Sequence, residues 1–256
     1  MLTSRLTVLV SGVDSDRWRE AGGVTETNTD ALMVVSLSAD QSQLVMMSLP
    51  RDTVDIPMPD GSTYRGKINS IERELGIDAL RDAVASLLGI EIDAYVQVDM
   101  DNFVRLVNTV GGIDVMVETP VVDPNLGLNL QPGPAHLDGS QALYYTRTRV
   151  DLDYARAARQ QQVLRALIAR YVDPETEWSF QSLLVHLDSL KTDLDLSRLP
   201  TLLELGRRAQ DAEVIGQVLG PPRFALFQGI EGPERGWVMI PNVPEMRSYA
   251  GSLIPD

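Results

Sequence analysis

The sequence predicts an α/β protein, a three-layer α/β/α sandwich with a central mixed sheet and a C-terminal helical elaboration. Short apolar runs rich in β-branched residues alternate with segments of helical periodicity along the 256-residue chain. One run, DALMVVSL at 30–37, is almost continuously apolar, as expected of a strand covered on both faces. No internal repeat or convincing linker divides the chain. We therefore expect residues 1–256 to form one domain, with the elaboration starting at about residue 173.

The strands are expected where short apolar runs are bounded by turn-forming residues. The first is LTVLV, which follows the N-terminus directly. The second and third are separated by SADQSQ, a length typical of a hairpin connection. The pattern predicts seven strands, at 6–10, 31–37, 44–49, 94–98, 113–117, 225–227 and 237–240.

The helices are expected between these strands. GIDALRDAVASLLG places its leucines and Val84 on one face and closes at Gly89. MDNFVRLVNTVGG starts with Asp101 as a plausible N-cap and stops at the glycine pair 111–112. The longest helix follows Asp153 and runs to about Tyr171, and two shorter ones are expected at 180–190 and 199–209. A proline-rich stretch at 119–134 predicts a surface-covering or functional loop.

Composition excludes several classes of function. The formal net charge of −14 argues against nucleic acid as a partner, because phosphate backbones are bound by broad basic surfaces. The chain has no cysteine, which removes disulfides, thiolate chemistry and cysteine-based zinc sites. With only His136 and His186, a histidine metal site or a Ser-His-Asp triad is disfavoured. The longest N-terminal apolar run is far shorter than the roughly 20 residues of a membrane-spanning helix.

A group of arginines stands out in this acidic chain, within RTRVDLDYARAARQQQ at 147–162. Extending the apolar stripe of the long helix backward by three and four residues reaches Gln160, Arg159 and Arg156. Arg147 and Arg149 alternate as in an extended segment, which places them on one side. Guanidinium groups beside a helix N-terminus suit phosphate oxygens, so this cluster predicts a polyanion site. The alternative is that the arginines pair with Asp151 and Asp153 on a solvated surface.

Two further signals lie at strand ends. In SLPRDT a buried strand ends abruptly at Arg51 and Asp52, and α/β folds bind ligands at such ends, although many strands simply finish in charged residues. In SGVDSD and TNTDALM, Asp14 and Asp30 are expected at the ends of neighbouring strands. Two carboxylates near a phosphate site favour Mg²⁺, which takes one or two carboxylates plus phosphate oxygens and water. Taken singly, each aspartate is as well explained as a turn former or a helix cap.

Taken together and in this order, these segments resemble the LytR–CpsA–Psr family along essentially the whole chain. The motifs that carry the resemblance are LVSGVDSD, TNTDALMVVSL, MMSLPRDT, GKINS, VGGIDV, LDGSQALYYTRTR and DYARAARQQQVL. The resemblance implies an extracytoplasmic, membrane-tethered phosphotransferase. Such an enzyme moves a glycopolymer from a polyprenyl-pyrophosphate carrier onto peptidoglycan or a related acceptor with Mg²⁺ or Mn²⁺, and it can have a pyrophosphatase side activity.

The resemblance also implies roles for individual residues. Asp14 and Asp30 match the family's metal ligands, and Asp52 is a candidate proton acceptor or arginine orienter. The catalytic set would be Arg51, Asp52, Arg149 and Arg156. The pyrophosphate would be held by Arg51, Lys67, Asn69, Arg147, Arg149, Arg156 and Gln160, with Arg159 added from the helical phase. The isoprenoid tail would lie in an apolar tunnel between the sheet and the helices.

The sequence departs from the family pattern at three places. Asn28 stands where many members have arginine, Ala155 replaces a glycine, and the segment between Arg149 and Arg156 is short. The family's N-terminal transmembrane helix is absent, so we expect this chain to be the extracytoplasmic catalytic portion, at the outer face of the membrane. Two rival functions remain at this point: a non-catalytic carrier of polyprenyl phosphates, and a transcriptional attenuator, against which the net charge weighs.

Overall fold

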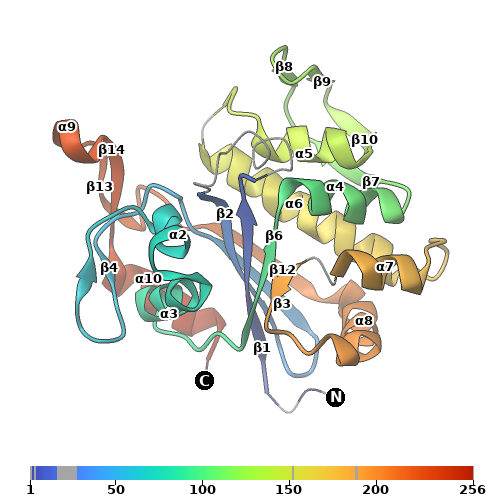
Figure 1. Ribbon diagram of the computed structural model, residues 1–256, viewed down its shortest axis with the longest axis horizontal. Helices are drawn as coiled ribbons and strands as arrows, with labels where there is room; N and C mark the ends of the chain where they lie inside the picture. The colour runs from blue at the N-terminus through green and yellow to red at the C-terminus, as the bar shows by residue number, and fades with distance from the viewer. Residues whose placement is uncertain (1, 3, 16–27, 152, 188–189, 256) are drawn as a thin grey trace.

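The structure is a computed structural model that describes residues 2, 4–15, 28–151, 153–187 and 190–255. Figure 1 shows a twisted central sheet with helices packed on both faces, which confirms the predicted three-layer α/β/α architecture. The sheet has the strand order β11-β6-β1-β2-β3-β12. Its strands are β1 (Leu6–Val13), β2 (Thr29–Leu37), β3 (Gln43–Ser48), β6 (Ala94–Val98), β11 (Lys191–Thr192) and β12 (Glu213–Val218).

The sheet is mixed, and its strand directions bring several strand ends to one edge. β1 is antiparallel to β2 and parallel to β6, while β3 is antiparallel to β2 and parallel to β12. The C-terminal ends of β1, β3, β6 and β12 therefore share an edge with the start of β2, at the top of Figure 1. Val13 pairs with Thr29 at this edge, so Asp14 and Asp30 lie at adjacent strand ends, as predicted.

One face of the sheet is covered by α3 (Ile77–Leu88) and α10 (Val243–Leu253), with the short α2 (Ile71–Leu75) beside them. α3 forms where the apolar spacing predicts it, and it ends at Gly89, whose φ of 67° gives the left-handed C-cap that glycine adopts without strain. Its apolar stripe packs with Leu9 and Val34 of the sheet in one continuous core. α10 closes this layer and was not predicted, because its periodicity is weak and two prolines, Pro241 and Pro244, stand at its start.

The opposite face is covered by five helices that share a second core. They are α4 (Met100–Thr109), α5 (Gly139–Arg147), α6 (Asp153–Val172), α7 (Phe180–Leu187) and α8 (Leu199–Arg208). The N-cap of α4 is Asp99, whose carboxylate accepts from the backbone N–H of Asn102, and not Asp101 as predicted. The predicted extension of α7 to 190 includes 188–189, which lie outside the described residues. No helix in the described part of the chain is long and apolar enough to cross a membrane.

Small two-stranded sheets lie outside the central sheet. β7 (Ile113–Val117) lies outside the central sheet and pairs with β10 (Gly133–Leu137). The predicted loop at 119–134 holds the hairpin of β8 (Val121–Asp123) and β9 (Leu128–Leu130). A similar hairpin, β4 (Ile56–Pro57) with β5 (Thr63–Tyr64), follows β3.

The C-terminal part is more than the helical elaboration expected from residue 173. β11 and β12 complete the two edges of the central sheet. β12 was missed because Glu213, Gly216 and Gln217 interrupt its apolar pattern, which an edge strand tolerates. Beyond it, β13 (Ala225–Ile230) and β14 (Trp237–Pro241) form a hairpin that carries the short helix α9 (Gly232–Arg235) at its tip. This hairpin projects at the upper left of Figure 1.

Candidate active site

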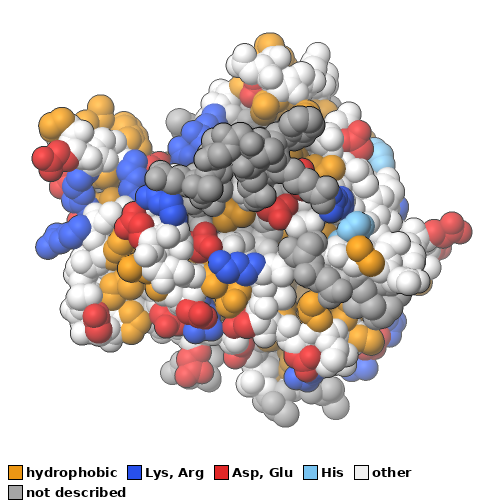
Figure 2. Space-filling model, viewed as in Figure 1, with side chains coloured by type: hydrophobic (Ala, Val, Ile, Leu, Met, Phe, Trp, Pro, Cys, Tyr) orange, Lys and Arg blue, Asp and Glu red, His pale blue; other side chains and the backbone are white. Residues whose placement is uncertain are grey.

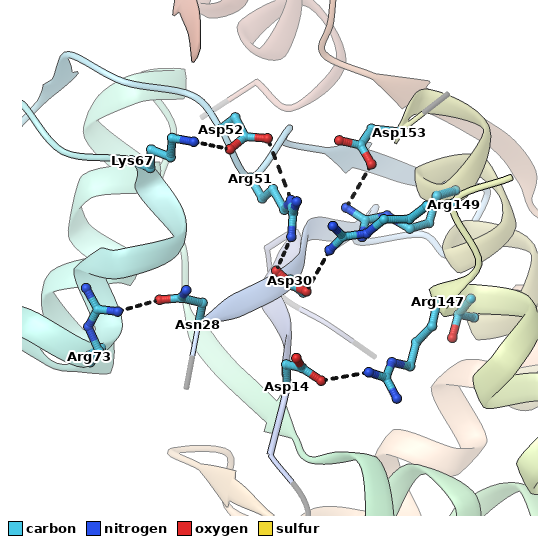
Figure 3. A network of polar contacts seen from close by, with 12 residues as sticks. Asp14, Asn28, Asp30, Arg51, Asp52, Lys67, Arg73, Arg147, Arg149 and Asp153 are labelled. Carbon is cyan, nitrogen blue, oxygen red and sulfur yellow. Dashed lines mark hydrogen bonds and ion pairs between the residues drawn. The ribbon is translucent and has the colours of Figure 1, made fainter. Parts of the chain in front are cut away.

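Two aspartates and three arginines form a network at the upper edge of the sheet (Figure 3). Arg147 donates from Nη2 to Oδ1 of Asp14 at 3.0 Å. Asp30 accepts two such bonds, at 2.8 Å from Nη1 of Arg51 and at 3.2 Å from Nη2 of Arg149. The sequence segments predicted to converge do so here, since these residues come from three distant parts of the chain.

Arg147 and Arg149 reach the network by a route that the sequence pattern did not predict. They do not alternate along an extended segment, because Arg147 is the last residue of α5. Thr148 then turns the chain out of the helix with ψ of 141°, and its buried hydroxyl donates to Asp123 at 2.6 Å. α5 itself is fixed at its start by a capping box between Asp138 and Gln141. The two guanidinium groups still face the same side.

Arg156 lies on the first turns of α6 and is only 6% exposed. Its Nη2 makes a long ion pair of 3.4 Å with Asp153, and its buried Nε has no hydrogen-bond partner. Burial, together with the like charges of Arg51 and Arg149, lowers the pKa of Arg156. A buried guanidinium with an unsatisfied N–H is costly, and a bound anion would supply the missing acceptor.

Below this network lies a cavity of about 430 Å³, here termed the apolar cavity. Asp14, Asp30, Arg147, Arg149, Arg156 and Gln160 line its mouth, and Gln160 is fixed by a 3.3 Å bond to the carbonyl of Thr146. Its depth is lined by aliphatic side chains of β1, β2, β6, α4 and α6. The predicted transition of α6 from cationic to apolar along one face is therefore confirmed.

A second apolar space continues the first along the same face of the sheet. This lower cavity, of about 950 Å³, is lined by Leu6 and Val8 of β1, whereas Val10 and Gly12 line the apolar cavity. The two share Leu106 and Leu167 as lining residues. Because alternate residues of β1 point to one face, the two spaces together follow the strand from Leu6 to Gly12, over about 20 Å at roughly 3.3 Å per residue.

On the other side of Arg51 lies a polar cleft of about 480 Å³. Arg51, Asp52, Lys67 and Asn69 line it, so four of the predicted site residues face this cleft and not the apolar cavity. Lys67 donates to Asp52 at 2.7 Å, and Arg51 Nε lies 3.6 Å from the same carboxylate. Burial opposes the charge on Arg51, yet its bond to Asp30 and the nearby aspartates raise its pKa overall.

Arg159, predicted to bind pyrophosphate, lines neither the apolar cavity nor the polar cleft. Its buried guanidinium donates to the carbonyls of Tyr145 and Thr148 and pairs with Asp151. It thereby ties α6 to the segment that carries Arg147 and Arg149. The helical periodicity correctly predicted that Arg159 faces inward. It could not show that acceptors of the protein itself already bind the guanidinium donors of Arg159.

Several residues of the site were missed by sequence reasoning. Gln161 is buried and donates to Ser48 at 2.9 Å and to the carbonyl of Gln217 at 3.1 Å, which fixes α6 on β3 and β12. Arg65, Arg73, Glu234 and Arg235 line the polar cleft, and no motif pointed to them. Arg73 donates to Asn28 at 2.8 Å, across 45 residues of sequence, in the place where Asn28 departs from the family pattern.

The site offers few metal ligands. In the described ranges no group of three or more His, Asp or Glu side chains is arranged to hold a metal ion. Asp14 and Asp30 line one cavity from neighbouring strands, and each is already bonded to arginine. Two carboxylates fit a Mg²⁺ ion that takes its remaining ligands from substrate phosphate and water.

Comparison with known proteins decides the family. A model of the LytR–CpsA–Psr family matches residues 2–218. The chain belongs to the LytR–CpsA–Psr family. This match covers every predicted site residue, and it ends at the last residue of β12, so the β13–β14 hairpin and α10 lie beyond it.

Two of the relatives that match this chain are named as teichoic acid transferases. The polyisoprenyl-teichoic acid–peptidoglycan teichoic acid transferase TagV of Bacillus subtilis (strain 168) is 39% identical over 150 residues, 56% of this chain and 38% of that protein. TagU of Enterococcus faecalis, named as the same kind of transferase, is 32% identical over 192 residues, 73% of this chain and 61% of that protein. The matched regions thus span 38% to 61% of these relatives' lengths.

Solved structures of the LytR–CpsA–Psr family have the same fold. The crystal structure of B. subtilis TagV aligns with a TM-score of 0.80 and 25% identity, over 99% of this chain and 98% of that one. A TagT structure with bound octaprenyl pyrophosphate lipid aligns with a TM-score of 0.71 and 21% identity, over 99% and 92% of the two chains. The mixed sheet and its helical layers are therefore common to these proteins.

Proposed function

We propose that this protein is a phosphotransferase that moves a glycopolymer from a polyprenyl-pyrophosphate carrier onto peptidoglycan or a related acceptor. One observation carries the proposal: a cluster of arginines lines one end of a cavity whose other lining residues are mostly apolar. A ligand that fits both parts has a compact polyanionic head and a long hydrocarbon tail. The names of the relatives, which are transferases of polyisoprenyl-linked teichoic acid, support the same ligand class.

The tail would occupy the apolar cavity and continue into the lower cavity. Burying hydrocarbon there is favourable by about 25 cal/mol per Å² of apolar surface, with no need for shape-specific polar contacts. The head would lie among Arg149, Arg156 and Arg51, where the free Nε of Arg156 lacks an acceptor. Bidentate guanidinium contacts suit phosphate oxygens and hold the phosphorus in one orientation.

In the proposed reaction an acceptor hydroxyl attacks the phosphorus that carries the glycan. The bond from that phosphorus to the oxygen of polyprenyl phosphate breaks, and the leaving group keeps the electron pair. Asp52 would take the hydroxyl proton, and Lys67 would hold its carboxylate in place through the 2.7 Å contact. Arginines aimed at the phosphate oxygens stabilise the charge that develops on the leaving group.

We further propose that Asp14 and Asp30 hold Mg²⁺ or Mn²⁺ when substrate is bound. The ion would neutralise charge on the pyrophosphate oxygens. Arg147 and Arg149 donate hydrogen bonds to these carboxylates in the structure. Both arginines would turn toward the phosphates when the carboxylates bind the ion. This exchange makes metal affinity depend on bound pyrophosphate. We place the reaction outside the cytoplasm, at the outer face of the membrane that holds the lipid carrier.

The test separates an enzyme from a lipid carrier. The protein is incubated with a polyprenyl-pyrophosphate-linked glycan, Mg²⁺ and peptidoglycan fragments, and released polyprenyl phosphate and glycan-bearing fragments are quantified. Equal amounts of both products support the transferase. Release without transfer would indicate a pyrophosphatase. Tight binding of the lipid with no turnover, in the presence of Mg²⁺ and acceptor, would favour a carrier.

A further inference from the structure

The polar cleft concentrates positive charge in an acidic protein. Two acidic residues, Asp52 and Glu234, line it, against five cations, which are Arg51, Arg65, Lys67, Arg73 and Arg235. The formal net charge of the whole chain is −14. Figure 2 shows Lys and Arg side chains gathered on the left of the molecule, between the α9 tip and the α2 region. The cleft is therefore a local basic surface that attracts an anion.

The cations differ in how free their donors are. Arg65 has 79% of its side chain exposed and makes one 3.3 Å contact, to Asp55. Arg73 uses one terminal nitrogen on Asn28 and the other on Glu74, yet about a third of its side chain is exposed in the cleft. Ion pairs at exposed side chains contribute little to stability, so both guanidiniums can exchange their partners for a ligand at little cost.

The outer wall of the cleft is built by the C-terminal hairpin, beyond the range that the family model matches. Arg235 donates to Glu231, to Asp55 and to the carbonyl of Arg65, which fixes α9 against the segment after β5. The backbone of Met239 exchanges hydrogen bonds with the carbonyl of Asp52 and the N–H of Val54. Hydrogen bonds on both sides of the hairpin therefore hold the outer wall of the cleft in place.

The position of the cleft fits the acceptor, whose hydroxyl attacks the phosphorus in the proposed reaction. Arg51 lines the cleft and bonds to Asp30, which lines the apolar cavity, so the two spaces adjoin at this ion pair, where the proposed phosphate would lie. If the lipid leaves toward the apolar cavity, an in-line displacement requires the attacking oxygen to approach from the opposite side. That side is the polar cleft, where Asp52 lies.

We propose that the polar cleft binds the acceptor, and that it recognises a hydroxyl-rich saccharide bearing carboxylate groups. This inference rests on the proposed function and adds the place and charge of its second substrate. The volume of about 480 Å³ lies in the range of roughly 300–1,000 Å³ usual for ligand sites. Arg65 and Arg73 bind the carboxylates, and Arg235 is a positioning residue that holds Arg65 in place.

The test compares the wild type with the double variant Arg65→Ala, Arg73→Ala in the transfer assay. The acceptors are a peptidoglycan fragment with free carboxylates and the same fragment amidated at those groups. We expect the variant to raise KM for the charged fragment by roughly 10-fold or more, because charge-assisted hydrogen bonds are lost. KM for the amidated fragment changes far less. The wild-type preference for the charged fragment also declines with added salt.

The matched control is Arg207→Ala, Arg208→Ala on α8, which removes the same charge from an exposed pair far from the cleft and keeps the wild-type KM. Circular dichroism and thermal melting establish that both double variants fold. Affinity for a polyprenyl-pyrophosphate lipid is measured with and without attached glycan. If the double variant weakens binding of the glycan-bearing lipid alone, the cleft holds the donor's glycan and the acceptor proposal is wrong.

Equal KM values for wild type and double variant on the charged fragment would also overturn the inference while leaving the proposed function intact. If the wild type transfers nothing, the proposed function fails, and calorimetry with the two fragments still tests the cleft. Binding of the charged fragment by wild type and its loss in the double variant would support the cleft as a site for anionic saccharide. Absence of binding to wild type would overturn it.

Discussion

The guanidinium of Arg51 and the carboxylate of Asp30 are joined by a 2.8 Å hydrogen bond that separates two spaces of opposite character. Arg51 lines the polar cleft, and Asp30 lines the apolar cavity. Asp30 also binds Arg149, so a single carboxylate balances guanidiniums from two distant segments. A phosphate at this point would contact both arginines and meet both spaces.

Arg156→Ala should reduce transfer by roughly 10²–10³-fold, the typical cost of removing one donor aimed at developing charge. Its stability should be unchanged or slightly higher, because the variant loses a buried charge whose Nε is unsatisfied. Polyprenyl phosphate release measures the rate, and urea denaturation measures the stability. The control Arg208→Ala removes an exposed arginine of α8 and should keep wild-type turnover. Wild-type turnover by Arg156→Ala would mean that this residue does not act in the reaction.

Arg159→Ala should show the opposite pattern, a loss of stability, because Arg159 has a structural role. The substitution leaves the carbonyls of Tyr145 and Thr148 and the carboxylate of Asp151 without their buried donor. We expect the free energy of unfolding to fall by about 2–4 kcal/mol. Arg159→Lys should recover little of it, since one ammonium cannot reach all three acceptors. If the variant instead kept wild-type stability but bound the lipid less tightly, Arg159 would be a ligand-binding residue.

Asp30→Asn should lower the free energy of unfolding by about 1–3 kcal/mol, because Arg51 and Arg149 lose the charge that both bind. Inorganic pyrophosphate should then raise the melting temperature of the variant more than that of the wild type. In calorimetry, pyrophosphate lipid should promote Mg²⁺ binding to the wild type but not to the variant. The control is Asp78→Asn on α3, an exposed aspartate with a long ion pair. Equal Mg²⁺ binding by Asp30→Asn and wild type would count against the metal assignment.

Alkaline pH should destabilise the fold through two tyrosines. Burial raises the pKa of Tyr154 and of Tyr171 from 10.0 to about 12. The unfolded chain therefore ionises first, and the contribution of these residues to stability is complete below pH 10 and is lost as the pH rises toward 12. Denaturant titrations across this window should show a decline that is shallower in Tyr171→Phe. A slope identical to the wild type would contradict the raised pKa of Tyr171.

The sequence allowed us to predict those elements and motifs that short stretches of residues specify. β2 and β3 contain runs of Leu, Val and Met that are largely buried, and the order of motifs identified the family. α5 was missed because its signals, the cap at Asp138 and the residue Gln141, precede a stretch with few aliphatic side chains. The residues at the outer wall of the cleft were beyond reach, because Arg235 contacts Asp55 across 180 positions. Arg159 shows the remaining limit: periodicity tells which side a residue faces, not which partner it finds there.

The backbone hydrogen bonds of Met239 join the loop after β3 to the C-terminal hairpin. Residues 52–54 acquire their partners on β14 only after the chain has been made as far as Met239. β12, the edge neighbour of β3, likewise comes about 165 positions after it in the sequence, and such distant pairings are slow to form. We therefore expect the sheet edge that carries Asp30 and Arg51 to be completed late in folding. A chain arrested or cleaved before Met239 would leave the backbone of residues 52–54 without these partners, so the hairpin braces the loop that carries Asp52.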